Sequence, residues 1–194
     1  MPKVETFNRD LVLDYATAVF HDKGYNATSM QDLVDATGLN RSSIYNSFIS
    51  KLELYLECLK AYESNFNRAA SNVLLKASNP FQAIEFIFDL YIEIISREQH
   101  YDKGCMIGNC KAEMANQEQS ITAFLEGNQK RMLQLFEDLV HNAQSEQRIN
   151  TRQTPKDYAL YLFSSLQGFR MTGILITDKA KLKTIANTIL QTLI

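Results

Sequence analysis

The chain has 194 residues, of which 45% are hydrophobic, and its formal net charge at pH 7 is −2. This length suits one large or two small domains with an apolar core. No apolar run reaches the roughly 20 residues that span a bilayer, and MPKVETFNRD lacks a signal-peptide core. Three cysteines at irregular spacing do not suggest a disulfide scaffold. We therefore expect a protein of the reducing cytoplasm, without a membrane partner.

Helical periodicity runs through nearly the whole chain, and no stretch alternates apolar and polar residues as a half-buried strand does. The first helix is predicted from about Asn8 to Lys23, and Gly24 is expected to end it. Thr28, with Gln31 three residues later, is predicted to form a capping box for the second helix.

Residues 28–51 predict a helix, a tight turn and a second helix. Met30, Leu33, Val34 and Thr37 recur at helical spacing, Gly38 supplies a turn, and Asn40 is a good N-cap. The second helix then buries Ile44 and Phe48. Its remaining side chains are small, polar or basic and suit a DNA major groove: Arg41, Ser42, Ser43, Asn46 and Ser47.

The rest of the chain predicts further helices in a row. A long helix is expected from a Ser50 cap to Asn79-Pro80, and the next begins at Pro80. A short helix near Cys105–Asn116 and a long one from about Glu118 to Ser145 follow, then one opened by Thr154-Pro155 and one capped by Asp178. Polar loops are expected at 96–104 and 148–154. The fold class is therefore all-α, with about nine helices. We expect a DNA-binding domain over 1–49 and a larger helical domain over 50–194.

The helix-turn-helix segment also resembles a known family. Thr28-Ser29, Asp32-Leu33-Val34, Thr37-Gly38-Leu39, Ser43-Ile44-Tyr45, Phe48 and Ser50-Lys51 are similar to the DNA-binding module of TetR/AcrR-type transcriptional regulators. Two positions depart from the pattern, since Ser47 stands where many members have His and Thr37 where Ala is common. The resemblance implies a dimeric regulator, a repressor that a small molecule releases from a palindromic operator. It also implies that residues 50–194 form the effector-binding and dimerisation domain.

The resemblance also implies roles for individual residues. Arg41, Ser42 and Ser43 would reach base edges or nearby phosphates, and Thr28, Tyr45, Ser47 and Lys51 would hold backbone phosphates. The full set of expected DNA contacts is Thr28, Ser29, Arg41, Ser42, Ser43, Tyr45, Asn46, Ser47 and Lys51.

The last two helices are the expected dimer interface. The eighth helix is apolar almost all round, which a helix buried on one face does not require. The expected contact residues are Leu162, Leu166, Phe169, Gly173, Ala186, Ile189 and Leu193. A fully internal helix of a monomer is the alternative.

An effector pocket is expected among helices five to eight, where large apolar groups mix with a few polar ones. The candidates are Phe88, Tyr91, Ile92, Cys110, Glu113, Met114, Phe124, Asn128, Phe163 and Gln167. This mixture favours an apolar or aromatic small molecule, although aromatic residues at helical spacing also occur in a plain core.

Two other interpretations stay open. Residues 1–60 contain six Lys and Arg against eight Asp and Glu, so the head is acidic, and a helical ligand-binding or protein-interaction adaptor without DNA binding would explain this balance. Alternatively, Cys105 near a helix start could be a reactive thiol of an electrophile sensor within the same fold, although two structural thiols, Cys105 and Cys110, are the simpler explanation. No phosphate loop, HExxH or GxSxG motif is present; we expect no catalytic residues, metal or cofactor.

Overall fold

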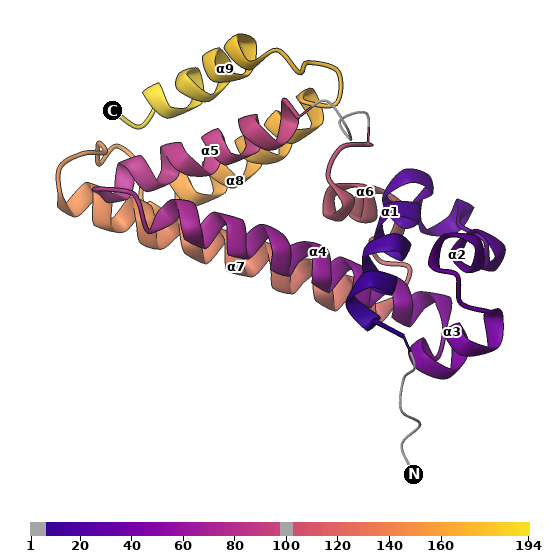
Figure 1. The fold of residues 1–194 in the computed structure, drawn as a ribbon. Helices are drawn as coiled ribbons and strands as arrows, with labels where there is room; N and C mark the ends of the chain where they lie inside the picture. The colour runs from indigo at the N-terminus through magenta and orange to yellow at the C-terminus, as the bar shows by residue number, and fades with distance from the viewer. Residues whose placement is uncertain (1–6, 98–102) are drawn as a thin grey trace. The chain divides into compact units, whose positions relative to one another are not determined.

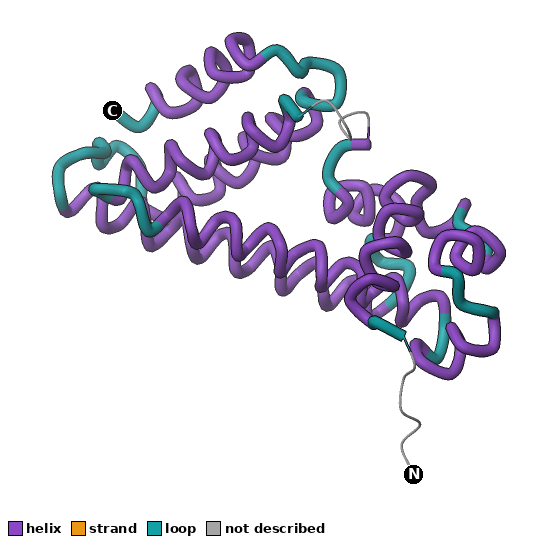
Figure 2. The backbone as a smooth tube through the Cα atoms, viewed as in Figure 1, coloured by secondary structure: helices purple, strands orange, loops and turns teal. Residues whose placement is uncertain are grey.

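The computed structural model describes residues 7–97 and 103–194, and within these ranges every regular element is a helix (Figures 1 and 2). The prediction of an all-α fold is confirmed. No helix among the described residues is long and apolar enough to cross a membrane. The contacts divide the chain into two units, one of Met1–Phe66 with Cys105–Ala123 and one of Asn67–Gly104 with Phe124–Ile194. We call them the head unit and the body unit.

The head unit contains helices from both halves of the chain. Its elements are α1 (Arg9–Ala27), α2 (Met30–Thr37), α3 (Arg41–Phe48), the first part of α4 (Lys51–Leu74), α6 (Met106–Met114) and the start of α7 (Gln119–Ser145). Its core is apolar and includes Phe20, Leu33, Ile44, Phe48 and Leu59, each at most 2% exposed. Helix α6 packs against α1, as Figure 1 shows, so the head unit extends beyond the first four helices.

Side-chain caps fix where most helices begin. Asn40 accepts a hydrogen bond from the Ser43 N–H at the start of α3, and Ser50 accepts one from the Glu53 N–H at the start of α4. These caps confirm local predictions, because a cap needs only residues within one turn of each other. The predicted capping box of Thr28 with Gln31 is wrong.

The capping box of α2 lies one residue later than predicted. The Ser29 hydroxyl accepts from the Asp32 N–H, and the Asp32 carboxylate accepts from the Ser29 N–H. The helical path of α1 resumes after Gly24 and continues to Ala27, so Thr28 ends α1 instead of starting α2. Its hydroxyl donates to the Gly24 carbonyl.

The body unit is built around α5 (Pro80–Ile95), α8 (Pro155–Thr172) and α9 (Lys179–Gln191), which pack on one another. Asn79, Thr154 and Asp178 cap these helices, and Pro80 and Pro155 occupy their first turns. The Asp178 cap and the starts at Pro80 and at Thr154-Pro155 confirm the predictions. Asn150, in the loop before α8, accepts a 2.6 Å hydrogen bond from the Tyr158 hydroxyl and donates to the carbonyls of Thr192 and Ile194. The loop therefore fastens the end of α9.

The connection between α5 and α6 lies only partly within the described residues. Ser96 ends α5, and Gly104, with φ 64°, precedes α6; the part of the predicted 96–104 loop at 98–102 lies outside the described residues. The short helix predicted near Cys105–Asn116 is confirmed with narrower bounds, Met106–Met114, and Cys105 is its N-cap residue.

Candidate nucleic-acid interface

Helices α2 and α3 form the predicted helix-turn-helix. Gly38 takes the left-handed conformation, φ 70° and ψ 2°, and its N–H donates to the Val34 carbonyl, which ends α2. Thr37 steadies the turn, because its hydroxyl donates to Leu33 O and accepts from the Leu39 N–H. Leu33 and Ile44 are both 0% exposed and hold the inner faces of the two helices. The opposite face of α3 is therefore fixed in orientation.

The expected DNA-contact residues differ in exposure. Ser29, Arg41, Ser42, Tyr45 and Asn46 are exposed, with Tyr45 at 44%; Ser43, Ser47 and Lys51 are half-buried. The exposed side chains on α3 form one stripe at helical spacing. We call Arg41, Ser42, Tyr45 and Asn46 the α3 face. The contacts of these side chains with DNA are predictions.

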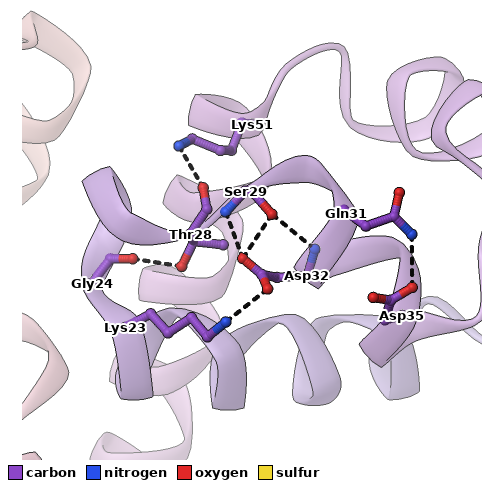
Figure 3. A network of polar contacts seen from close by, with 8 residues as sticks. All are labelled: Lys23, Gly24, Thr28, Ser29, Gln31, Asp32, Asp35 and Lys51. Carbon is purple, nitrogen blue, oxygen red and sulfur yellow. Dashed lines mark hydrogen bonds and ion pairs between the residues drawn. The ribbon is translucent and has the colours of Figure 1, made fainter.

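Thr28 and Lys51 have partners inside the head unit (Figure 3). Thr28 is 1% exposed. The Lys51 ammonium donates to Tyr25 O at 2.9 Å and to Thr28 O at 2.8 Å, and lies 4.3 Å from the centre of the Tyr25 ring. In this arrangement Lys51 satisfies carbonyls at the end of α1. A phosphate contact by Lys51 would have to form beside or replace these bonds.

An ion pair joins α1 to the start of α2. The Lys23 ammonium donates to the Asp32 carboxylate at 2.7 Å, the same carboxylate that completes the capping box (Figure 3). The hydrogen bond from Lys23, then those from Ser29, hold the pKa of Asp32 well below its usual range, and the Asp32 bond raises the pKa of Lys23. The Asp32 contribution to stability is complete above the unfolded pKa of about 3.9 and is lost as the pH falls through the lower folded value.

Arg9 ties the start of α1 to α3 and α4. Its guanidinium donates to both Glu57 carboxylate oxygens, at 2.7 and 2.8 Å, and lies 4.3 Å from the centre of the Phe48 ring. The sequence prediction did not give Arg9 a role of this kind. A basic residue in the first turn of the predicted first helix and an acid on the fourth were the available signal, but sequence spacing does not show that they meet.

The junction between α3 and α4 has an unusual backbone. Ile49 has φ 65° and ψ −51°, and the Ser50 N–H donates to Phe48 O at 2.6 Å, which closes a three-residue γ-turn around Ile49. A β-branched residue with positive φ is an outlier, and such a conformation costs of order 1–3 kcal/mol. The Ile49 side chain is nevertheless 78% exposed.

Glu113 on α6 binds the backbone of α1. Its carboxylate accepts from the Tyr25 N–H at 2.9 Å and from the Asn26 N–H at 2.7 Å. Both N–H groups are available to a side-chain acceptor because Gly24, with φ 76° and ψ 175°, interrupts the helical hydrogen bonding. Together with Lys51, which binds the carbonyls of Tyr25 and Thr28, Glu113 holds the Gly24–Thr28 segment through its backbone.

The predicted effector-pocket residues fall into two groups. Cys110, Glu113 and Met114 belong to the head unit, and the other seven belong to the body unit. Within the body unit, the rings of Phe88 and Phe169 meet edge to face at 5.7 Å, and Phe88, Tyr91 and Ile92 are buried. Phe124, Asn128, Phe163 and Gln167 are half-buried.

Arg170 joins two of these candidates and was not among them. It donates to the Gln167 side-chain oxygen at 3.0 Å, and its guanidinium lies 5.1 Å from the centre of the Tyr91 ring. Its Nε is buried without a hydrogen-bond partner in the described part of the chain. An arginine near the end of a helix rich in apolar residues was the available sequence signal.

The expected dimer-contact residues lie mostly inside their own chain. Leu162, Leu166, Phe169, Ala186 and Leu193 are at most 2% exposed, and Ile189 is half-buried. Gly173 is buried against α5, since a Cβ there would lie 2.6 Å from the Cδ1 atom of Ile95.

A different set of α8 side chains is free of the body-unit core. Leu160 is 49% and Met171 62% exposed, Ser164 is exposed, and Gly168 has open space around it. We call these four residues the outer α8 face. This face is therefore the part of α8 that is most accessible to a second copy of the chain.

The cysteines have different surroundings. Burial raises the pKa of the Cys58 thiol to about 12, and burial also raises the pKa of the Cys110 thiol, which is hydrogen-bonded to Tyr55. Cys105 is half-buried and makes no side-chain cap to α6. No group of three or more potential metal ligands gathers among the residues that the structure describes.

We expect iodoacetamide at pH 8 to modify Cys105 in the folded protein, and Cys58 and Cys110 only after unfolding, because the thiolate is the reactive form and both buried thiols disfavour it. Peptide mass spectrometry of native and denatured samples measures this order.

If Cys105 also senses electrophiles, mild electrophile treatment abolishes DNA binding in the parent chain and not in Cys105→Ser. Equal loss in both would rule out sensing through Cys105.

Family models match both parts of the chain. The family described as bacterial regulatory proteins, tetR family, matches residues 12–58, and the tetracyclin repressor-like C-terminal domain matches residues 80–189. The chain belongs to the TetR family of bacterial regulatory proteins. It is a helix-turn-helix transcriptional regulator of that family, and the first match covers α2, the turn and α3.

Individual relatives agree with this assignment. The HTH-type transcriptional regulator YezE of Bacillus subtilis (strain 168) is 28% identical over 154 residues, 79% of each chain. The HTH-type transcriptional repressor DhaR of Mycobacterium sp. (strain GP1) is 26% identical over 161 residues, 82% of this chain and 79% of DhaR. A cysteine mutant of the TetR family regulator CifR, solved with a 26-base-pair operator DNA, has the same fold, with TM-score 0.86, 18% identity and coverage of 99% of this chain and 100% of CifR.

Proposed function

We propose that this TetR-family protein is a repressor that binds a palindromic operator as a homodimer and is released by a small-molecule effector. The α3 face carries the proposal: Arg41, Ser42, Tyr45 and Asn46 are exposed on a helix whose other side is locked by Ile44 and Phe48. Hydrogen-bonding side chains on a fixed helix suit the major groove. The CifR complex with operator DNA and the repressor DhaR support this reading.

Recognition divides between bases and phosphates. Arg41 opens α3 and is fully charged, so it suits a guanine edge or a phosphate, and Asn46 suits an adenine edge. Ser29 stands at the N-terminus of α2, where backbone N–H groups favour a phosphate. In a two-fold dimer the two copies of α3 would enter successive major grooves about 34 Å apart.

We propose the outer α8 face as the centre of the dimer contact. It presents apolar side chains beside small ones, Leu160 and Met171 with Ser164 and Gly168, so a second helix can approach closely. The residues predicted from the sequence, Leu162, Leu166, Phe169, Gly173, Ala186, Ile189 and Leu193, are mostly buried within their own chain, so we propose the exposed α8 residues in their place. A dimer would give an acidic, weakly charged head the affinity that one copy lacks.

We propose that an apolar or aromatic effector with a hydrogen-bond acceptor binds the body unit. The aromatic pair Phe88 and Phe169 and the ring of Tyr91 supply apolar contact, and the unpartnered Nε of Arg170 supplies the polar anchor. Effector binding would change the separation of the two recognition helices and uncouple the half-sites. Functionally we divide the chain at residues 49 and 50 and propose a cytoplasmic regulator without catalytic activity.

Selection of duplexes from a random-sequence library with the full chain tests the function. We expect a palindromic consensus whose affinity falls as the salt concentration rises. Arg41→Ala should weaken binding by about 1–3 kcal/mol. Arg152→Ala, which removes an exposed arginine of the body unit, is the matched control and should bind like the parent chain. A chain that enriches no sequence and shows no salt-dependent binding would instead be a protein-binding adaptor.

A further inference from the structure

We propose that Ile49 makes an apolar contact with the operator, to a thymine methyl group or the face of a deoxyribose. The inference rests on the proposed DNA binding and adds an apolar contact to the polar α3 face. Its observations are the position, the exposure and the backbone conformation of this residue.

The position of Ile49 continues the α3 face. Ser42, Tyr45, Asn46 and Ile49 follow at i, i+3, i+4 and i+7, and all four are exposed. The Ile49 N–H still donates to the Tyr45 carbonyl, so Ile49 stays in register with the last turn of α3. A helix that lies in the major groove with the α3 face inward therefore brings Ile49 toward the DNA as well.

The backbone at Ile49 is better suited to another residue. With φ 65° and ψ −51°, the γ-turn favours glycine, and a branched Cβ makes it less favourable. Packing of the Ile49 side chain within the protein offsets little of this backbone cost, because the side chain is 78% exposed while that of Phe48 beside it is 1% exposed. An isoleucine at this place stabilises neither the turn nor the core of the head unit.

The chemistry at the DNA surface supplies a reason. Major-groove edges offer the thymine C5 methyl, and the backbone offers sugar faces; both accept an aliphatic side chain. Such a contact neutralises no phosphate and releases no counterion, unlike a contact made by arginine or lysine. Loss of the Ile49 side chain should therefore weaken binding at every salt concentration by the same factor.

The test uses the full chain, the selected palindromic duplex and fluorescence anisotropy. We expect Ile49→Gly to weaken binding about 10-fold without changing the slope of log affinity against log salt concentration. Its melting temperature should equal or exceed that of the parent chain, because glycine suits the positive φ. Ile49→Leu keeps an apolar side chain and should bind within about 3-fold of the parent.

Replacing single thymines by deoxyuridine locates the contact. If Ile49 meets a methyl group, one replacement weakens the parent chain and leaves Ile49→Gly unaffected; if it meets a sugar, every replacement affects both chains equally. Parent-like binding by Ile49→Gly, a changed salt slope, or equal loss in Ile49→Leu would overturn the inference while the proposed function stands. Failure of the parent chain to bind any duplex would instead reject the proposed function.

Discussion

A charge on the outer α8 face should separate the dimer and reduce operator affinity by about 100-fold or more. The double change Leu160→Glu with Met171→Glu places four carboxylates, two from each copy, in an interface of apolar and small side chains, where unpaired charges are strongly unfavourable. A single head then binds alone, and the gain of about 10²–10⁴ that linkage of two sites provides is lost. Light scattering should give a mass near 22.2 kDa for the variant and twice that for the parent chain.

Leu75→Glu is the matched control for this prediction. Leu75 is 85% exposed and follows α4, away from α8 in the sequence, so its replacement should leave the mass and the affinity unchanged. Circular dichroism should show the same helix content for all three chains, since exposed positions tolerate substitution with little change in stability. A dimeric double variant with full affinity would place the interface elsewhere.

Replacing Gly24 by alanine should lower the free energy of unfolding by about 3 kcal/mol, through two effects on one residue. The backbone at φ 76° and ψ 175° lies in a region that only glycine occupies readily. A Cβ there would also lie 2.7 Å from the Glu113 carboxylate oxygen that binds Tyr25 N–H. The alanine therefore strains α1 and displaces the carboxylate that satisfies it.

Urea unfolding followed by circular dichroism measures this loss. Gly38→Ala is the informative control, because Gly38 also has positive φ, 70°, but a Cβ there meets nothing within 4 Å. Its loss should be smaller for two reasons: Gly38 has the left-handed helical conformation, ψ 2°, which alanine adopts at a lower cost than the conformation of Gly24, and no side chain is displaced. Equal losses at both positions would show that neither the glycine-only backbone conformation of Gly24 nor the displaced Glu113 carboxylate adds to the loss.

Local sequence signals predicted the helix starts well. Asn40 and Asp178 cap the helices that they were predicted to cap, and Thr154 caps the helix predicted to open at Thr154-Pro155, because a cap depends on neighbours within one turn. Ser29 and Thr28 are both residue types that commonly serve as helix N-caps. The choice between them depends on how far α1 continues after Gly24, and that is decided by long-range contacts from Glu113 and Lys51.

The candidate site was predictable as a helix face and less so as single contacts. The outward side chains of α3 follow from the buried positions of Ile44 and Phe48. The bonds of Lys51 to two carbonyls do not, because they join residues 23 and 26 positions apart. Apolar residues lie on nearly every side of α8, so the pattern did not indicate which side faces the core. Leu162 and Leu160 therefore could not be assigned to core and surface from the sequence.

The hydrogen bonds between Glu113 and α1 limit which domains of such regulators can be recombined in a chimera. Tyr25 and Glu113 are 88 residues apart, and the family match for the DNA-binding module ends at residue 58. A chimera that joins this module to the effector half of another relative would leave the Tyr25 and Asn26 N–H groups without their carboxylate unless the incoming α6 provides one. Compatibility of recombined regulators therefore depends on Glu113, a residue outside the grafted DNA-binding module that nevertheless binds its backbone.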